Sequence, residues 1–152
     1  MGNIKKLKYD KKLGLYIGKA YILPFDTELE VIVDEDVEIV YVEKCIEYIN
    51  NLPQSLLNKI SERAYKYYDF IRNECGDVDD ILHEKIMEHV YPLNIFIEKP
   101  EADIPAFDIE CGCDWEEEHG MEIIIKGDEL LYIGEYAGLG PWADKECYEC
   151  IF

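Results

Sequence analysis

Residues 107–136 read FDIECGCDWEEEHGMEIIIKGDELLYIGEY, and this stretch predicts three β-strands joined by two turns. Its first segment, 107–113, alternates between apolar and polar side chains, a period of two that is typical of a strand with one buried face. The apolar side carries Phe107, Ile109, Cys111 and Cys113, and the opposite side carries Asp108 and Glu110. This strand therefore predicts a sheet with one face against a hydrophobic core.

The next two segments, 121–126 and 129–136, predict a β-hairpin. Gly127 and Asp128 lie between them, and a Gly-Asp pair suits the two-residue turns that match strand twist. Such a turn pairs Ile125 with Leu130 and Ile123 with Tyr132, which gives the hairpin an apolar face.

The remaining elements follow from hydrophobic periodicity. Strands are expected at 5–9, 14–23, 28–33 and 93–98, and helices at 39–51, 54–74 and 79–90. The segment 39–51 begins with β-branched residues that also favour a strand, but its apolar residues recur at helical steps. Gly76 closes the clearest helix, 54–74. The order predicts an α+β fold in one domain, residues 1–152, with an antiparallel sheet and two or three helices packed on one face.

The net charge of −19 limits the classes of partner. Residues 1–25 hold six lysines and one acid, whereas residues 101–152 hold fifteen acids and two bases. Phosphates of nucleic acids and anionic membranes repel such a chain, so we expect neither as a partner. A partner selected by charge is a basic protein; alternatively, the acidity only keeps the protein soluble. No apolar run is long enough to cross a bilayer, and no secretory signal is evident at the N-terminus, so a cytoplasmic location is expected.

Several segments together resemble a known family. They are YVEKCIEYINNL at 41–52, the Tyr-rich helix after it, CDWEEEHGME at 113–122, LYIG at 131–134 and Pro141-Trp142. The chain is similar over residues 37–142 to uncharacterised bacterial proteins that share a Trp-Glu-x-Glu-His-Gly block near the C-terminus. The resemblance implies fold and element order. By analogy, small acidic proteins of this kind occur among immunity proteins that neutralise bacterial toxins.

The bend at 114–120 is the principal candidate for a binding site, because polar and aromatic groups gather at the ends of predicted strands. The candidate binding residues are exposed acids with an aromatic anchor: Trp115, Glu116, Glu117, Glu118, His119, Glu122, Glu135 and Trp142. A structural interpretation competes with this one. In it, Trp115 anchors the bend in the core, His119 and a glutamate cap exposed backbone groups by hydrogen bonds, and Gly120 supplies an unusual backbone angle.

Two metal sites are possible alternatives. His119 with Glu116 and Glu118 could bind a metal or act in hydrolysis. Four thiols, Cys111, Cys113, Cys147 and Cys150, could hold zinc. Against zinc, Cys111 and Cys113 share the apolar face of a strand and lack the two-residue gap of a zinc knuckle.

The sequence thus favours a non-enzymatic, acidic interaction protein without a cofactor, and the resemblance implies, by analogy, an immunity protein that neutralises a basic toxin. The alternative is a metal-binding protein or metal-dependent hydrolase. No catalytic residue is assigned.

Overall fold

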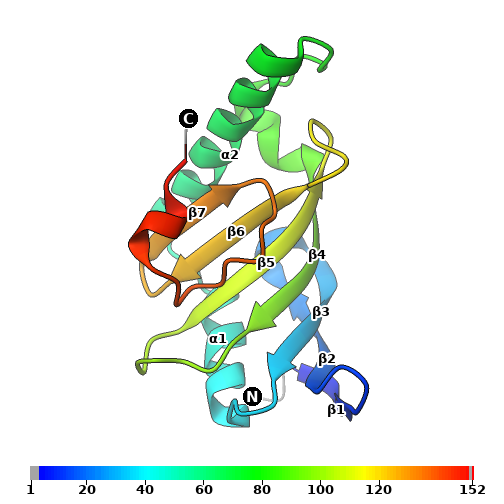
Figure 1. Ribbon diagram of the computed structural model, residues 1–152, viewed down its shortest axis with the longest axis vertical. Coiled ribbons are helices and arrows are strands. Elements are labelled where there is room, and N and C mark those ends of the chain that lie inside the picture. Colours follow the sequence, from blue (N-terminus) through cyan, green and yellow to red (C-terminus); the bar gives the residue numbers. More distant parts are fainter. Residues whose placement is uncertain (1–3, 151) are drawn as a thin grey trace.

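The computed structural model describes residues 4–150 and 152. It consists of a seven-stranded sheet with two α-helices behind it (Figure 1). The strands are β1 (Ile4–Asp10), β2 (Leu15–Ile22), β3 (Thr27–Asp34), β4 (Val90–Ile97), β5 (Ala106–Cys113), β6 (Met121–Lys126) and β7 (Glu129–Gly134). The helices are α1 (Ile39–Ile49) and α2 (Gln54–Cys75), with short 3₁₀-helices η1 (Leu23–Phe25), η2 (His83–His89) and η3 (Lys145–Tyr148).

The strands lie in the sheet in sequence order, and only β3 and β4 pair in parallel. The other pairs are antiparallel. Parallel neighbours need a long crossover, and α1, α2 and η2 provide it. The predicted α+β class and the largely antiparallel sheet are confirmed, whereas the parallel pair was not foreseen.

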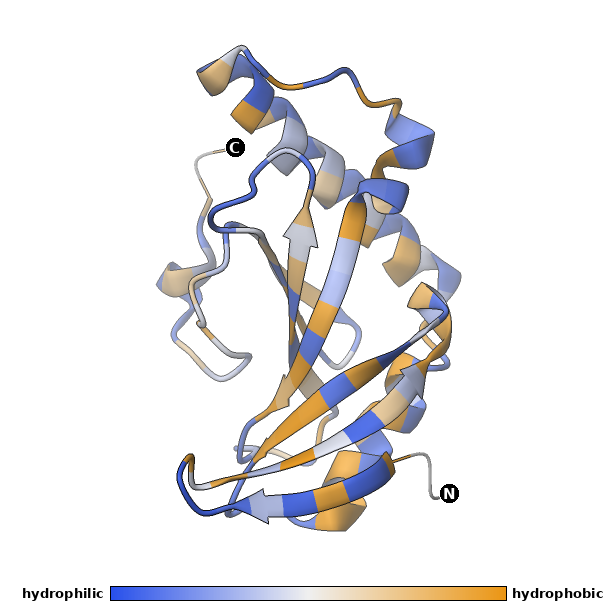
Figure 2. Cartoon of the chain, turned by 90° about the vertical axis from the view of Figure 1, so that its right-hand side faces the viewer, coloured by the Kyte–Doolittle hydropathy of each residue, from blue (hydrophilic) through white to orange (hydrophobic). Residues whose placement is uncertain are grey.

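The main core lies between the helices and one face of the sheet. On α1, the buried residues Tyr41, Val42, Cys45, Ile46 and Ile49 recur at three- and four-residue steps, which confirms the helical interpretation of this segment. The strands alternate between hydrophobic and hydrophilic residues where one face is exposed, as the strands of the first hairpin show (Figure 2). Gly76 ends α2 with φ +77°, as expected for a left-handed helix cap.

Three predicted elements differ from the structure. The third helix, expected at 79–90, is the shorter 3₁₀-helix η2, and β4 follows it directly at Val90 rather than at residue 93. Strand β7 ends at Gly134 instead of Tyr136. The chain turns away there because residues 135–143, named the C-terminal strap here, cross the outer face of the sheet (Figure 1).

One of the two residue pairs predicted for the β6–β7 hairpin is confirmed. Ile125 pairs with Leu130, but Ile123 pairs with Ile133, not with Tyr132. An irregularity between Ile124 and Ile125 shifts the register by one residue, as an inserted bulge residue does. The shift places Ile133 in the core beneath the helices and Tyr132 in a second cluster on the outer face.

Candidate functional site

The bend between β5 and β6 is anchored by its tryptophan. Trp115 is 4% exposed, and its ring meets Tyr67 and Tyr68 of α2 edge-on at centroid distances of 5.8 and 5.7 Å. The Tyr67 hydroxyl also donates a 2.7 Å hydrogen bond to the carbonyl of Gly120. These contacts fix the bend against α2, so Trp115 cannot be the exposed aromatic anchor that the sequence suggested.

The structural interpretation of the bend is confirmed for Trp115, for a capping glutamate and for Gly120. Its remaining part is wrong, because within the described residues the His119 side chain lies near two carboxylates and bonds no backbone group. The backbone N–H groups of Glu118 and His119 donate to Oε1 of Glu116, at 3.1 and 3.3 Å. Gly120 has φ +65°, and a Cβ at this position would collide with the carbonyl oxygen of Cys111. The sequence of the bend therefore has structural reasons, but its acidic side chains remain free to act outward.

A groove opens beside this bend. The segment that follows α2 and the β5–β6 bend lie at the same end of the molecule (Figure 1) and enclose a volume of about 760 Å³. Seven carboxylates line it, together with His89, Trp115 and three further residues. The seven are Asp77, Asp79, Asp80, Asp114, Glu116, Glu117 and Glu118. Among the residues that the structure describes, no lysine or arginine lines this groove.

Besides Glu116, two of these carboxylates are partly engaged. Asp80 makes a 3.1 Å ion pair with Arg72 of α2. Asp114 accepts a hydrogen bond from the Tyr91 hydroxyl at 2.9 Å and lies 2.7 Å from Nδ1 of His89. The bond to Asp114 raises the pKa of Tyr91 above its ordinary value. The side chains of Asp77, Asp79, Glu117 and Glu118 are exposed, and within the described part of the chain none of them takes part in a hydrogen bond or an ion pair.

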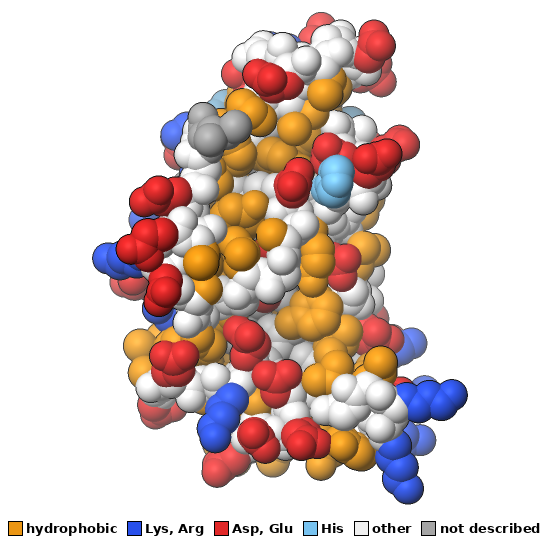
Figure 3. Space-filling model, viewed as in Figure 1, with side chains coloured by type: hydrophobic (Ala, Val, Ile, Leu, Met, Phe, Trp, Pro, Cys, Tyr) orange, Lys and Arg blue, Asp and Glu red, His pale blue; other side chains and the backbone are white. Residues whose placement is uncertain are grey.

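Charged side chains are unevenly spread over the surface. Acidic side chains lie over much of the face shown in Figure 3, including the end that carries the β5–β6 bend, whereas a group of basic side chains lies at the lower right, beside β1 and β2. Because the groove is lined by carboxylates and by no lysine or arginine among the described residues, its potential is negative.

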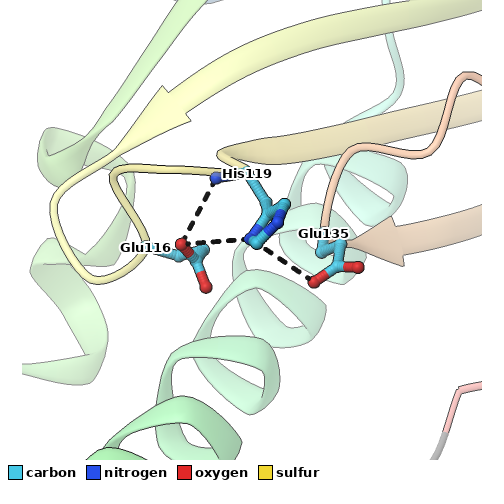
Figure 4. A group of neighbouring side chains, drawn as sticks. All are labelled: Glu116, His119 and Glu135. Atoms are coloured by element: carbon cyan, nitrogen blue, oxygen red, sulfur yellow. Dashed lines mark hydrogen bonds and ion pairs between the residues drawn. The ribbon is translucent and has the colours of Figure 1, made fainter.

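A second cluster lies on the other side of the same bend. His119 Nδ1 lies 3.5 Å from Oε1 of Glu116 and 3.8 Å from Oε2 of Glu135, which follows β7 (Figure 4). Within residues 4–150 and 152, this is the one group of three potential metal ligands whose donor atoms lie within 4.8 Å of one another. Glu118 is not part of the group, so the predicted triad is corrected by replacing it with Glu135.

Glu122 is not an exposed acid as expected. It is fully buried beneath the C-terminal strap, where its two oxygens accept 3.1 Å hydrogen bonds from the backbone N–H groups of Ala137 and Leu139. Asp108 lies in the same layer and accepts a 3.2 Å bond from Gly140 N–H. Both acids face away from the helices because they alternate with the core residues of β5 and β6.

Asp108 is buried beside a second acid. It is 3% exposed, and its Oδ1 has no hydrogen-bond partner among the described residues. Burial, followed by the neighbouring Glu122, raises the pKa of Asp108 to about 9. The raised pKa favours the protonated form of Asp108 at neutral pH.

Trp142 lies apart from the groove. Its ring lies 5.2 Å from Nζ of Lys126, at the end of β6 opposite to the bend. Five residue steps along a strand correspond to about 17 Å. Trp142 therefore packs the strap onto the sheet instead of serving the same surface as Glu117 and Glu118.

The cysteines do not assemble into a group of four. Cys111 and Cys113 are buried in the main core, whereas Cys147 is exposed and Cys150 lies near Arg63 and Ile133. Burial raises the pKa of Cys113 to about 12 and that of Cys111 well above its ordinary value. These two thiols pack as small apolar side chains.

Sequence reasoning missed half of the groove. Asp77, Asp79, Asp80 and His89 lie in a segment that reads as a loop and a short helix, far from the bend in the chain. Their run of acids was visible in the sequence. Their position opposite residues 114–118 depends on the packing of α2 against the sheet, which no local pattern encodes.

Comparison with known proteins gives one positive result. A search of the curated proteins and a search of the solved structures each found no match. Within the residues that the structure describes, no helix combines the length and the apolar character that crossing a bilayer requires. A family model described as a domain of unknown function (DUF6985) matches residues 3–140. Because the match covers most of the sequence, the chain belongs to the DUF6985 family.

Proposed function

We propose that this protein is a non-enzymatic binding protein that docks a basic protein partner in the acidic groove between the end of α2 and the β5–β6 bend. The observation that carries the proposal is the set of seven carboxylates around a groove of about 760 Å³ with no lining lysine or arginine among the described residues. Four of the seven are exposed and unengaged within the described part of the chain, so they can pair with incoming lysines or arginines.

Physical chemistry favours a protein partner for this groove. Unpaired carboxylates that face one another repel, and a cationic side chain placed between them relieves that repulsion. A negative field also accelerates the encounter with a basic surface and excludes acidic competitors. An arginine or lysine could lie over the rim while its aliphatic stem packs along Val78 and Ile81, which also line the groove.

The narrower form of this proposal is an immunity protein that neutralises a basic toxin. It rests on the sequence resemblance and on the charge. In that form, the groove would cover the basic substrate site of the toxin by charge and shape.

The test uses two variants that lose the same charge at different places. The groove variant carries Asp77→Asn, Asp79→Asn, Glu117→Gln and Glu118→Gln. The control variant carries Asp36→Asn, Asp144→Asn, Glu47→Gln and Glu101→Gln, four acids that are also exposed. Basic proteins encoded beside the gene serve as ligands in calorimetric titrations at low and high salt.

The groove variant should bind about tenfold or more weakly than the wild type, because each exposed pair contributes up to about 1 kcal/mol. It should also lose much of the salt dependence, while the control variant keeps both the affinity and the salt dependence. Absence of a salt-sensitive complex, or equal losses in the two variants, would refute the proposal.

A further inference from the structure

The donor atoms of Glu116, His119 and Glu135 surround a small space instead of bonding one another. Nδ1 of His119 lies 3.5 Å from the Glu116 oxygen and 3.8 Å from the Glu135 oxygen. Both distances exceed the 2.7–3.2 Å of an ordinary N–H···O bond. One ring nitrogen also carries only one proton, so it cannot serve two carboxylates at once.

The same distances suit a divalent cation. Zinc binds histidine nitrogen and carboxylate oxygen at about 2.0–2.2 Å, and a tetrahedral arrangement with such bonds separates its ligand atoms by about 3.4 Å. The two separations from His119 Nδ1, 3.5 and 3.8 Å, lie within a few tenths of an ångström of this value, and the third is no more than 4.8 Å. From this geometry we infer that Glu116, His119 and Glu135 form a binding site for a divalent transition metal, with zinc as the best fit.

The backbone holds the three ligands in place. Glu116 is oriented by the two N–H groups that donate to its Oε1, and its Oε2 takes no part in these bonds. The carbonyl of His119 accepts a 3.3 Å bond from Tyr136 N–H, which ties the bend to the residue after Glu135. The carbonyl of Glu135 in turn accepts a 2.7 Å bond from the Tyr132 hydroxyl. Preformed ligands lose little freedom when the ion binds.

The donor set selects the class of metal. An imidazole ligand favours zinc and its first-row neighbours over magnesium or calcium, which prefer oxygen ligands alone. Three protein ligands leave a fourth position open to water, as in zinc sites that are not purely structural. His119 and Glu135 are half-exposed, so the ion can enter from solvent.

The experiment titrates the full chain with Zn²⁺ in a calorimeter and repeats the titration with Co²⁺, whose visible absorption reports its ligands. His119→Gln and Glu135→Gln each remove one ligand. Two controls match them: His89→Gln removes the histidine that pairs with Asp114, and Glu118→Gln removes a neighbouring acid outside the cluster. A third control, Cys147→Ser with Cys150→Ser, removes an exposed thiol and a half-buried thiol near the C-terminus, both outside the buried core.

The wild type should bind one Zn²⁺ per chain. His119→Gln or Glu135→Gln should weaken Zn²⁺ binding by more than about 100-fold. Losing a group that only orients a ligand, by comparison, weakens metal binding by roughly 10- to 100-fold. The three controls should bind as the wild type does. The inference is overturned if the wild type binds no Zn²⁺ stoichiometrically, if His119→Gln binds normally, or if only the cysteine variant loses the metal.

Discussion

Replacing Asp108 by asparagine should stabilise the protein at neutral pH, although the residue lies in the interior. The carboxyl of Asp108 has its pKa raised to about 9 by burial and by Glu122. An aspartic acid in the unfolded chain has a pKa near 3.9. Between these two values, the folded state keeps a proton that the unfolded chain has released.

The sign follows from proton linkage. Because the folded state binds more protons in this window, the free energy of unfolding falls by up to about 1.4 kcal/mol for each pH unit above pH 4. The contribution is fully present below pH 4 and is lost as the pH rises toward 9. Over the three units from pH 4 to 7, the loss approaches about 4 kcal/mol.

Asparagine removes this loss and retains the local bonds. Its amide oxygen can accept from Gly140 N–H, and its amide nitrogen can donate to Glu122. We allow about 1 kcal/mol for a poorer fit of the amide. The variant should therefore be more stable than the wild type by about 3 kcal/mol at pH 7 and no more stable at pH 4.

Urea denaturation of both proteins, at pH values from 4 to 8, measures the difference directly. Glu117→Gln is the matched control, because Glu117 is exposed and should give a small difference that changes little with pH. A constant difference between Asp108→Asn and the wild type across the whole range would refute the raised pKa of Asp108. So would a loss of stability in the variant at every pH.

Three further outcomes follow from the same structure. Gly120→Ala should lower the free energy of unfolding by at least about 2 kcal/mol, since φ is +65° and the new Cβ would meet the Cys111 carbonyl. Thermal denaturation measures this loss, and an unchanged melting temperature would contradict the close approach of Gly120 to Cys111. Glu122→Ala should lower the free energy of unfolding by about 2–4 kcal/mol and speed amide hydrogen exchange at residues 137 and 139, because two hydrogen bonds to the strap are lost. Unchanged exchange at these residues would show that the carboxylate does not hold the strap. In the native protein at pH 8, a thiol reagent should modify the exposed Cys75 and Cys147, as mass spectrometry would show. The reagent should spare Cys45, Cys111 and Cys113, because burial raises the pKa of these thiols, and their rapid labelling would mean that the core is open.

Local patterns were sufficient for most elements and insufficient for the site. Residues 54–74 carry a helical stripe ended by Gly76, and residues 107–113 carry a strand alternation, so both appear in the structure almost as expected. Asp108 alternates with core residues and reads as an exposed acid. It is buried because the strap, which has no periodic pattern, covers that face of the sheet.

Long-range packing explains the other differences. The parallel pairing of β3 and β4 depends on where the helical crossover returns the chain, and the groove depends on where α2 ends relative to the bend. Glu135 joins His119 only because β7 ends beside the bend. In each case, the residues were visible in the sequence, but their neighbours were not.

Carboxyl footprinting of the complex with a basic partner tests the docking groove most directly. A carbodiimide labels accessible carboxylates, and mass spectrometry then reports each site in the free and the bound protein. We expect labelling to fall on complex formation at Asp77, Asp79, Glu117 and Glu118 and to stay constant at Asp36, Glu47, Glu101 and Asp144. Protection confined to other carboxylates, with the four groove acids labelled as in the free protein, would contradict it.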